Sequence, residues 1–332
     1  MHIGAPQEKK ASKTLCVAPM MAWTDRHCRY LHRLFAPSAQ LFTEMVTTGA
    51  LLHGEQWHQL DYNPEEHPVA LQLGGNDPTA LAACTQRAFD LGYDEVNLNV
   101  GCPSDRVQNG AFGACLMKEP DLVAACLERM GMDKRGVVSV KCRLGVDGAD
   151  SDELLHNFIQ RVSDAGCQKF YVHARIAILS GLSPAQNREI PPLQPERVKA
   201  LKAAFPALDI SINGGITTLD GAIDHLGWAD GVMIGRAAYH DPDLLTQIHQ
   251  CLADPTFAPN KFELLVKYAA YAKEQFEQGV RLQPLIKPLL GACNGMPGAR
   301  KFRRTLSDHR RLQQGDTQVF SDAFSHVFRE AA

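Results

Sequence analysis

The sequence predicts an α/β protein built as a (β/α)8 TIM barrel, followed by a small all-helical domain at the C-terminal end. Two observations predict the barrel: eight short runs of β-branched or apolar residues, and helix-sized amphipathic segments between most of these runs. Eight such units over roughly 235 residues match the ~250 residues usual for this fold. A doubly wound sheet is the alternative, but the GxGxxG fingerprint that it would normally carry occurs nowhere in the chain.

The predicted strands alternate with predicted helices along the first three quarters of the chain. In order, the strands are residues 15–20, 41–45, 69–75, 95–102, 138–144, 169–175, 209–215 and 231–236. The helical segment from Pro78 follows Asp77, which is a good N-cap, and begins with a favourable first-turn proline. This segment and the one at 151–166 both end at a glycine suited to a C-terminal cap.

The chain divides into three predicted parts. Residues 1–14 are polar, lack the apolar core of a signal peptide, and are predicted to be a disordered leader. Residues 15–253 are predicted to form the barrel. Residues 254–332 show helical patterns with no strand between them, and are predicted to form the all-helical domain.

Charge is spread unevenly between these parts. The net charge is −3, but residues 261–332 hold 12 Lys or Arg against 7 Asp or Glu, a local charge of +5. The remainder holds 22 against 30, a charge of −8. A basic end on an acidic body is typical of a protein with an anionic partner, although a solvated helical surface would have the same composition.

Cysteine usage and hydropathy indicate the compartment. The ten cysteines include no CxxC pair and no regular spacing, which argues against zinc ligation and against a secreted disulfide framework. No hydrophobic run approaches the ~20 residues that a membrane-spanning helix needs. The sequence therefore predicts a cytoplasmic, reduced protein with no metal site and no membrane contact.

Most of the predicted strands end in polar residues, and the carboxyl ends of the strands are where barrel enzymes carry their chemistry. Such residues are poor core material, because burying an unpaired polar group costs kilocalories. The strand ends carry Pro19, Met20, Gln72, Asn97, Asn99, Cys102, Lys141, Arg143, His173, Arg175, Asn213, Gly214, Gly215, Gly235 and Arg236. Lining one polar ligand would explain these residues together.

Glycine-rich turns follow the last two predicted strands, "NGGI" from Asn213 and "GRAAY" from Gly235. Turns at these two positions are the usual phosphate site of the fold, and Arg236 is available there as a charge partner. With Lys141 and Gln72 facing a planar ring, the turns predict a flavin mononucleotide (FMN) site. A Gly-Gly pair alone is more often a simple turn, so the prediction depends on the joint placement.

Eight segments of the chain closely resemble the tRNA-dihydrouridine synthases. They are "VAPMMAWTDRHCRYL", "TEMVTTGAL", "VALQLGG", "NLNVGCPSDRVQNGAFGACLM", "KCRLGV", "SGLSPAQNREIPPL", "SINGGI" and "GVMIGRAAY". The "REIPPL" segment and the full "GCPSDRVQNGAFGACLM" resemble the bacterial A type in particular. The resemblance implies reduction of the C5–C6 double bond of tRNA D-loop uridines, at positions 20 and 20a, with bound FMN and with NADPH as reductant.

The resemblance also implies roles for single residues. Cys102 would be the catalytic acid, and Asn99 would contact the target uridine or its ribose. FMN would be held by Pro19, Met20, Met21, Gln72, Lys141, His173, Asn213, Gly214, Gly215, Gly235 and Arg236. Ile176 and Ile178 depart from the family pattern, which would have a lysine and an aromatic residue there, so the tRNA contacts of this loop are expected to differ.

A thiol suits the role implied for Cys102. When hydride passes from FMN to C6 of uracil, negative charge develops on C5 and O4, and C5 must receive a proton from a positioned acid. An ordinary thiol has a pKa of ~8.5, so it is mostly protonated at neutral pH, where a carboxylic acid would already be ionised. Cys102 is therefore expected to act as an acid rather than a nucleophile.

Contacts with tRNA are expected from the basic C-terminal region. The segment "GARKFRRTLSDHRR" contains Arg300 and Arg303, and Arg188 in "QNREIPPL" would add a contact from the barrel. Phosphate contacts set the register and offset the few kilocalories needed to take a base out of its stack. An electropositive RNA-binding face makes a monomer the expected state.

Two other functions fit part of the sequence. An FMN-dependent oxidoreductase of free pyrimidines, similar to a dihydroorotate or dihydropyrimidine dehydrogenase, would share the fold and the flavin but would not need a basic helical tail. A non-catalytic tRNA-binding module would explain the tail, but not the polar strand ends or Cys102.

Overall fold

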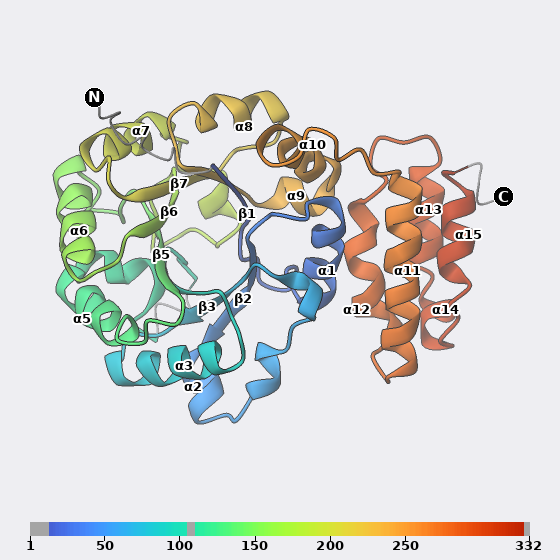
Figure 1. Cartoon of the computed structure of the whole chain (residues 1–332), viewed down its shortest axis with the longest axis horizontal. Coiled ribbons are helices and arrows are strands. Elements are labelled where there is room, and N and C mark those ends of the chain that lie inside the picture. The colour runs from blue at the N-terminus through green and yellow to red at the C-terminus, as the bar shows by residue number, and fades with distance from the viewer. Residues whose placement is uncertain (1–12, 105–109, 329–332) are drawn as a thin grey trace, which may run out of the picture.

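The structure, a computed structural model, describes residues 13–104 and 110–328. Most of the chain forms a closed ring of strands with helices packed outside it (Figure 1). The predicted leader lies outside the described residues up to position 12. Thr14, placed in the leader by the prediction, is the first residue of a strand.

Eight parallel strands form one sheet, in the order β1-β8-β7-β6-β5-β4-β3-β2. Their bounds are β1 Thr14–Val17, β2 Leu41–Thr47, β3 Val69–Gly74, β4 Glu95–Val100, β5 Val137–Arg143, β6 Lys169–His173, β7 Asp209–Asn213 and β8 Gly231–Ile234. This order is that of a (β/α)8 barrel, in which each strand pairs with the next along the chain. The predicted fold class is confirmed.

Gln40 closes the barrel between the first two strands. Its backbone N–H donates to the Leu15 carbonyl at 2.8 Å, and its carbonyl accepts from the Val17 N–H at 2.9 Å. These bonds form a parallel bridge between Cys16 and Gln40, one residue before β2 begins. The ring of strands is therefore complete without a long exposed edge.

Helices follow most of the strands and cover the outside of the ring. Around the barrel they are α1 Arg26–Phe35, α2 Thr48–Leu52, α3 Pro78–Asp90, α5 Pro120–Met130, α6 Asp152–Asp164, α7 Pro195–Ala204, α8 Leu219–Leu226, α9 Arg236–His240 and α10 Asp243–Leu252. Short 3-10 helices lie at η1 Trp57–Leu60, η2 Pro64–Glu66, η3 Gly113–Lys118, η4 Gln186–Arg188 and η5 Lys287–Gly291.

The end signals read from the sequence are present in the structure. The Asp77 carboxylate accepts from the Ala80 backbone N–H at 2.7 Å and caps α3. Gly92 and Gly166, just after α3 and α6, have φ of +95° and +98°, the left-handed conformation that favours glycine. The predicted helix ends at these two positions are confirmed.

Most of the strands are shorter at their carboxyl ends than predicted. β1 stops at Val17 rather than Met20, and β4 stops at Val100 rather than Cys102. β6 and β7 each stop two residues early, before Arg175 and Gly215. The chain continues with Ala18 and Pro19 after β1 and with glycines after β4 and β7, and these residues leave the ladder to form loops. Strand pairing therefore ends where the predicted site begins.

The barrel has two separate apolar layers. The large core lies between the strands and the outer helices, while a small cluster lies inside the ring of strands. That inner cluster consists of Cys16, Ala18, Phe42, Ala70, Tyr171 and Met233. The other inward-facing positions hold buried polar residues, whereas bulky branched residues usually fill a barrel of this kind.

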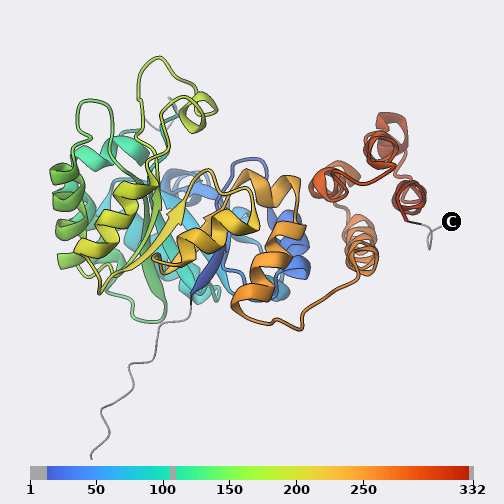
Figure 2. The same cartoon turned by 90° about the horizontal axis from the view of Figure 1, so that it is seen from above.

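Beyond the barrel, the C-terminal helices form a group beside α1 (Figure 2). They are α11 Lys261–Glu277, α12 Leu282–Ile286, α13 Ala299–Leu306, α14 His309–Gln313 and α15 Val319–Ser325. Tyr271 of α11 stacks on Tyr30 of α1 with ring centroids 3.9 Å apart, and its hydroxyl lies 2.8 Å from His27 Nδ1. The described part of this region holds no strand, and the domain boundary after residue 253 stays a prediction.

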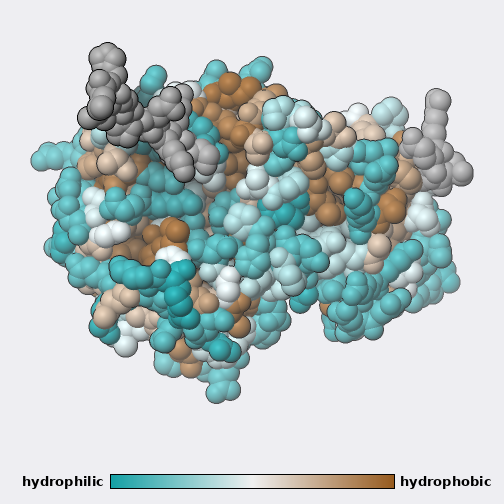
Figure 3. Space-filling model, in the orientation of Figure 1, coloured by the Kyte–Doolittle hydropathy of each residue, from teal (hydrophilic) through white to brown (hydrophobic). Residues whose placement is uncertain are grey.

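The face of the molecule seen in Figure 1 is mainly hydrophilic, with apolar residues gathered in separate patches (Figure 3). Among the helices of the described residues, none is long and apolar enough to cross a membrane.

Candidate active site

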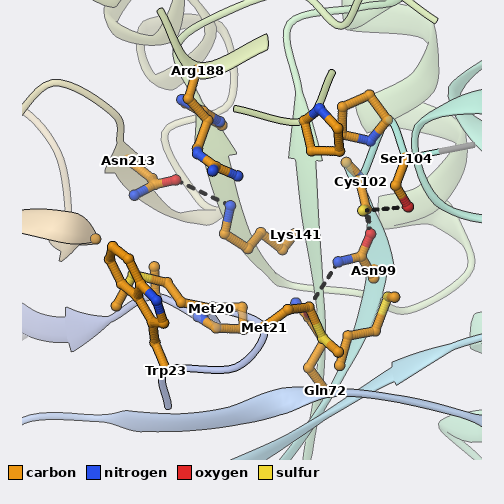
Figure 4. A pocket seen from close by; sticks show the side chains of 18 of the residues that line it. Met20, Met21, Trp23, Gln72, Asn99, Cys102, Ser104, Lys141, Arg188 and Asn213 are labelled. Atoms are coloured by element: carbon orange, nitrogen blue, oxygen red, sulfur yellow. Dashed lines mark hydrogen bonds between the residues drawn. The ribbon is translucent and has the colours of Figure 1, made fainter. Parts of the chain in front are cut away.

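A cavity of about 840 Å³ opens at the carboxyl ends of the strands. Every site residue predicted on the barrel lines it (Figure 4). These are Pro19, Met20, Met21, Gln72, Asn99, Cys102, Lys141, His173, Arg188, Asn213, Gly214, Gly215, Gly235 and Arg236. The barrel geometry thus brings together residues that are far apart in the sequence, and their individual roles stay predictions.

The two arginines predicted on the C-terminal helices lie outside this cavity. Arg300 and Arg303 are exposed on α13. The Arg303 guanidinium donates to the Asn294 side-chain oxygen at 2.5 Å, and the Asn294 amide donates to the His240 carbonyl at 2.7 Å. Because His240 ends the helix that follows β8, this pair of bonds ties α13 to the barrel near the mouth of the cavity.

Lys141 and Asn213 form one wall of the cavity. Lys141 comes from β5, and its Nζ donates to Asn213 Oδ1 at 3.0 Å, while the Asn213 amide donates to the Met233 carbonyl at 2.8 Å. Burial lowers the pKa of Lys141 to about 8, and the nearby charge of Arg143 acts in the same direction. The ammonium is therefore bound to a neutral oxygen and gains from any anion placed beside it.

The cavity is strongly cationic. Among the described residues that line it, five are Lys or Arg and none is Asp or Glu; the five are Lys141, Arg143, Arg175, Arg188 and Arg236. Burial, together with the first four of these cations, also lowers the pKa of His173 well below its ordinary value of 6.5, so this imidazole is neutral at pH 7. Such a field favours an anionic ligand.

Arg236 does not stand free as the sequence suggested. Its guanidinium pairs with Glu189 at 2.7 Å, and both side chains are about half exposed, at 45% and 64%. Glu189 follows η4 and was not predicted as a site residue. The Glu189 carboxylate therefore holds the Arg236 guanidinium at this turn.

The glycine turn after β7 is shaped by close neighbours. Gly214 and Gly215 have φ of +111° and +71°. A Cβ on Gly214 would lie 2.6 Å from the His173 ring, and one on Gly215 would overlap the Leu193 side chain. Only glycine fits both the backbone conformation and the space, and the turn leaves its backbone N–H groups near the cavity.

The loop that carries Cys102 is held from two sides. Asn99 Oδ1 accepts from the backbone N–H of Cys102 at 2.9 Å and of Gly101 at 3.2 Å. The buried Arg143 donates from Nε to the Gly101 carbonyl at 2.9 Å. The Cys102 thiol itself points toward Ser104, with Sγ 3.5 Å from Oγ. The part of this motif at residues 105–109 lies outside the described residues.

Sequence reasoning missed two features of the cavity. Trp23 stacks on Tyr239 at 4.4 Å between ring centroids and forms an aromatic edge beside the exposed Met21. Arg143 was placed at a strand end without a role, but it joins two loops through the Gly101 and Ile176 carbonyls. The tryptophan within "MAWTD" could have signalled the first feature, whereas nothing local in the sequence signals the second.

The predicted departures from the family pattern lie beside the cavity. Ile176 and Ile178 are not among its lining residues. The Ile178 backbone N–H donates to Asn187 Oδ1 at 2.8 Å, which helps to fold the loop that carries Arg188.

A cationic cavity at the carboxyl ends of the strands, with a glycine turn after β7, is the arrangement of a barrel enzyme that binds a phosphorylated ligand. Comparison with known proteins narrows this class. A sequence model described as Dihydrouridine synthase (Dus) matches residues 16–329. The chain belongs to the dihydrouridine synthase family, whose members reduce uridine in tRNA to dihydrouridine, and it is an oxidoreductase.

Known relatives match nearly the whole chain. The tRNA-dihydrouridine(20/20a) synthase of Pasteurella multocida is 53% identical over 312 residues, 94% of this chain and 95% of that protein. The protein of the same name from Yersinia pestis is 51% identical over 314 residues, 94% of this chain and 90% of that protein. The resemblance read from the sequence is confirmed.

A solved structure also matches. A 2-naphthoyl-CoA reductase in complex with 2-naphthoyl-CoA has a TM-score of 0.55 and 11% identity, over 71% of this chain and 50% of that chain. At this identity the likeness shows the fold alone.

Proposed function

We propose that this chain reduces uridines 20 and 20a in the D-loop of tRNA, with FMN as its bound cofactor and NADPH as the reductant. The observation that carries the proposal is the cavity itself, which has five cationic side chains and no carboxylate among its described lining residues, and the Cys102 thiol in its wall. The two uridine positions rest on the names of the relatives, which are about half identical to the chain.

The residues present fit FMN. Gly214, Gly215 and Gly235 would hold the phosphate through backbone N–H groups, with Arg236 as its charge partner. Pro19, Met20, Met21, Gln72, Lys141 and His173 would contact the ring system. Lys141 supports this assignment most directly, because its half-buried ammonium is hydrogen-bonded to the neutral Asn213 amide oxygen and would be stabilised by an electron-rich ligand. When bound, FMN supplies a hydride that it has received from NADPH.

Cys102 supplies the proton in this proposal. The bond between Sγ and its hydrogen breaks, and the proton goes to C5 of uracil while C6 gains the hydride. Asn99 and Arg143 hold the peptide group that joins Gly101 to Cys102, through its N–H and its carbonyl, so the acid needs little reorganisation as the base arrives. The Asn99 amide can hydrogen-bond the uracil ring without adding a charge.

Phosphate contacts hold the tRNA. Arg300 and Arg303 are exposed on α13, and Arg188 reaches the cavity from the barrel side. Contacts on both sides of the cavity mouth would fix the register of the D-loop and offset the few kilocalories needed to unstack the target base. We also propose a cytoplasmic location and a monomeric state.

The proposal is tested by colour and product together. The purified protein should be yellow, should bleach when NADPH is added without oxygen, and should regain its colour when tRNA that lacks dihydrouridine follows. The tRNA should then contain dihydrouridine. Recovery of colour with a free pyrimidine but not with tRNA would contradict the proposal and favour an oxidoreductase of free pyrimidines. A colourless protein that binds tRNA would indicate a non-catalytic module.

A further inference from the structure

A chain of hydrogen bonds runs through the barrel interior, from the amino end of β4 to the Cys102 loop. Its links are Cys102 N–H to Asn99 Oδ1 (2.9 Å), Asn99 Nδ2 to Gln72 Oε1 (2.8 Å), Gln72 Nε2 to Asn97 Oδ1 (2.8 Å), Asn97 Nδ2 to Ser139 Oγ (2.7 Å) and Ser139 Oγ to Glu95 Oε1 (2.5 Å). Every side chain in it is buried, except that of the half-buried Cys102. Figure 4 shows the Asn99–Gln72 end.

Period-two spacing along β4 builds this chain. Glu95, Asn97 and Asn99 point to the same side of the strand, into the barrel, because side chains alternate along β-structure. Parallel pairing then sets Gln72 of β3 beside Asn97, and Ser139 of β5 on its other side. The polar interior is thus a product of strand register.

All the donors in the chain point the same way, toward Glu95. A carboxylate has acceptors only, so the Ser139 hydroxyl must donate to it and must accept from Asn97. Each amide in turn has its oxygen toward the loop side and its nitrogen toward Glu95. At the loop end of the chain, the Asn99 oxygen accepts from the backbone N–H groups of Gly101 and Cys102.

Glu95 is fixed as the acceptor at this end. Its second oxygen accepts from Lys169 Nζ at 2.9 Å and from the Tyr171 hydroxyl at 3.1 Å. Glu95 is 1% exposed, so the carboxylate is retained inside the barrel by its ion pair with Lys169. Neither Lys169 nor Glu95 lines the ligand cavity.

We propose that Glu95 is a positioning residue, which sets the orientation of the Gln72 and Asn99 amides and thereby holds the Cys102 loop. Each of these amide nitrogens uses one hydrogen in the chain and has a second that can be offered to a ligand, and both residues line the cavity. The orientation thus makes both residues donors toward the site. The claim about the loop stands on the geometry alone, and the catalytic consequence rests on the proposed function.

The substitution Glu95→Gln keeps the shape of the side chain but replaces a group that only accepts hydrogen bonds with one that also donates them. The new amide oxygen is held by Lys169 and Tyr171, so its nitrogen faces Ser139 and acts as a donor. Propagated along the chain, this reversal would turn the Asn99 nitrogen toward the Gly101 and Cys102 N–H groups, where donor meets donor. In that arrangement the loop bond breaks. Ser139 avoids the reversal only by accepting from both amide nitrogens, which leaves its own buried hydroxyl hydrogen without the Glu95 acceptor.

The test is hydrogen exchange of the Gly101 and Cys102 backbone amides in the full chain, measured without tRNA or NADPH. We expect exchange about tenfold faster in Glu95→Gln than in wild type, since a partnered N–H loses its acceptor. Tyr171→Phe is the matched control, because it removes a hydrogen bond to the same carboxylate on its other oxygen and leaves the chain intact. Its exchange at these two amides should equal that of wild type.

If Glu95→Gln does not fold, a second variant tests whether the hydrogen-bond chain holds the Cys102 loop. Ser139→Ala keeps the Glu95–Lys169 pair and cuts the chain one link away, and should also accelerate exchange at Gly101 and Cys102. Wild-type exchange in the folded variants, or equal acceleration in Tyr171→Phe, would overturn the proposal and leave Glu95 a structural residue. This result is independent of the activity, which is measured separately.

The rate of uridine reduction is a second test of the role proposed for Glu95. In Glu95→Gln, kcat for uridine reduction should fall about 100-fold through misplacement of the acid, with the Kd for tRNA unchanged. If wild type reduces no uridine, the proposed function fails while the exchange result still decides the positioning role. Faster exchange with unchanged kcat would confine Glu95 to holding the loop and overturn its catalytic consequence.

Discussion

Lys141 Nζ donates to Asn213 Oδ1 at 3.0 Å, joining β5 to the end of β7 across the mouth of the barrel. The partner is neutral, and burial lowers the pKa of Lys141 to about 8. The ammonium is thus charged below pH 8 and loses its proton above it. A bound anion stabilises the charged form, so binding should raise this pKa and take up a proton near pH 8.

From this relationship we expect FMN affinity to fall as the pH rises through about 8. The measurement is fluorescence titration of FMN into flavin-free protein at a series of pH values from 6.5 to about 9.5, bracketing the shifted pKa. The variant Lys141→Met should bind FMN more weakly and should lose the fall in affinity that begins near pH 8. An equally steep fall in the variant would show that another group is responsible.

A second prediction concerns the Glu189 carboxylate, which forms an ion pair with the Arg236 guanidinium. Because this pair is half exposed, breaking it should change the thermal stability little, but it frees the guanidinium for phosphate. Glu189→Gln should lower the Kd for FMN about two- to fivefold at low salt, an effect that should shrink as salt is added.

The matched control for Glu189 is Asp121→Asn, which breaks a similarly exposed pair with Arg161 on α6. It should leave the Kd for FMN unchanged. A weaker affinity in Glu189→Gln would indicate that the carboxylate orients Arg236 for the ligand rather than competing with it.

A third prediction tests the tRNA surface on α13. Alanine at Arg300 and Arg303 together should weaken tRNA binding and should reduce the slope of log K against log salt by about one to two units. The kcat at saturating tRNA should change little, because neither residue lines the cavity. Arg161→Ala on α6 is the control. An unchanged salt slope would mean that this face of α13 is only a solvated surface.

A fourth prediction concerns the folding of the C-terminal helices. Gly298 has φ of +87°, and a Cβ there would overlap the His326 carbonyl, whereas Gly295 has φ of +79° with open space around a Cβ. Gly295→Ala should lower the free energy of unfolding by about 1 kcal/mol, the cost of the left-handed backbone. Gly298→Ala should cost a further ~1–3 kcal/mol for the overlap, measured by urea denaturation. Equal losses would contradict the packing of α13 against residue 326.

Much of the fold follows from the sequence, because short β-branched or apolar runs, helix caps and glycine ends are local signals. The strand ends also predict the cavity, since parallel strands present their carboxyl ends on the same face of the barrel. The sequence does not show which partners a charged side chain contacts in the folded protein. Glu95 at the start of a strand resembles an ordinary surface residue until strand register places its carboxylate beside Ser139 and Lys169.

The same limit applies at the cavity mouth. Glu189 and Arg236 are distant in sequence, and only the fold of the segment after β6 brings them together. Trp23 meets Tyr239 because β1 and β8 are neighbours in the closed ring. Such pairs form only when the barrel closes, and no local sequence pattern predicts them.

Cys102 is the acid that we propose completes uridine reduction. The two cysteines of this loop region offer a matched pair, since Cys115 is also half-buried nearby, with its thiol donating to the Phe112 carbonyl at 3.0 Å. Cys102→Ala removes the proposed proton, whereas Cys115→Ala removes a thiol of the same burial class that does not line the cavity. Both variants should bind FMN and tRNA as wild type does.

The most direct measurement is the dihydrouridine content at each position of tRNA lacking this modification, after incubation with NADPH and each protein. We expect reduction at positions 20 and 20a by wild type and by Cys115→Ala, and a rate lower by about 10²–10⁴-fold in Cys102→Ala. Reduction by Cys102→Ala at the wild-type rate would contradict this expectation and assign the proton to another group.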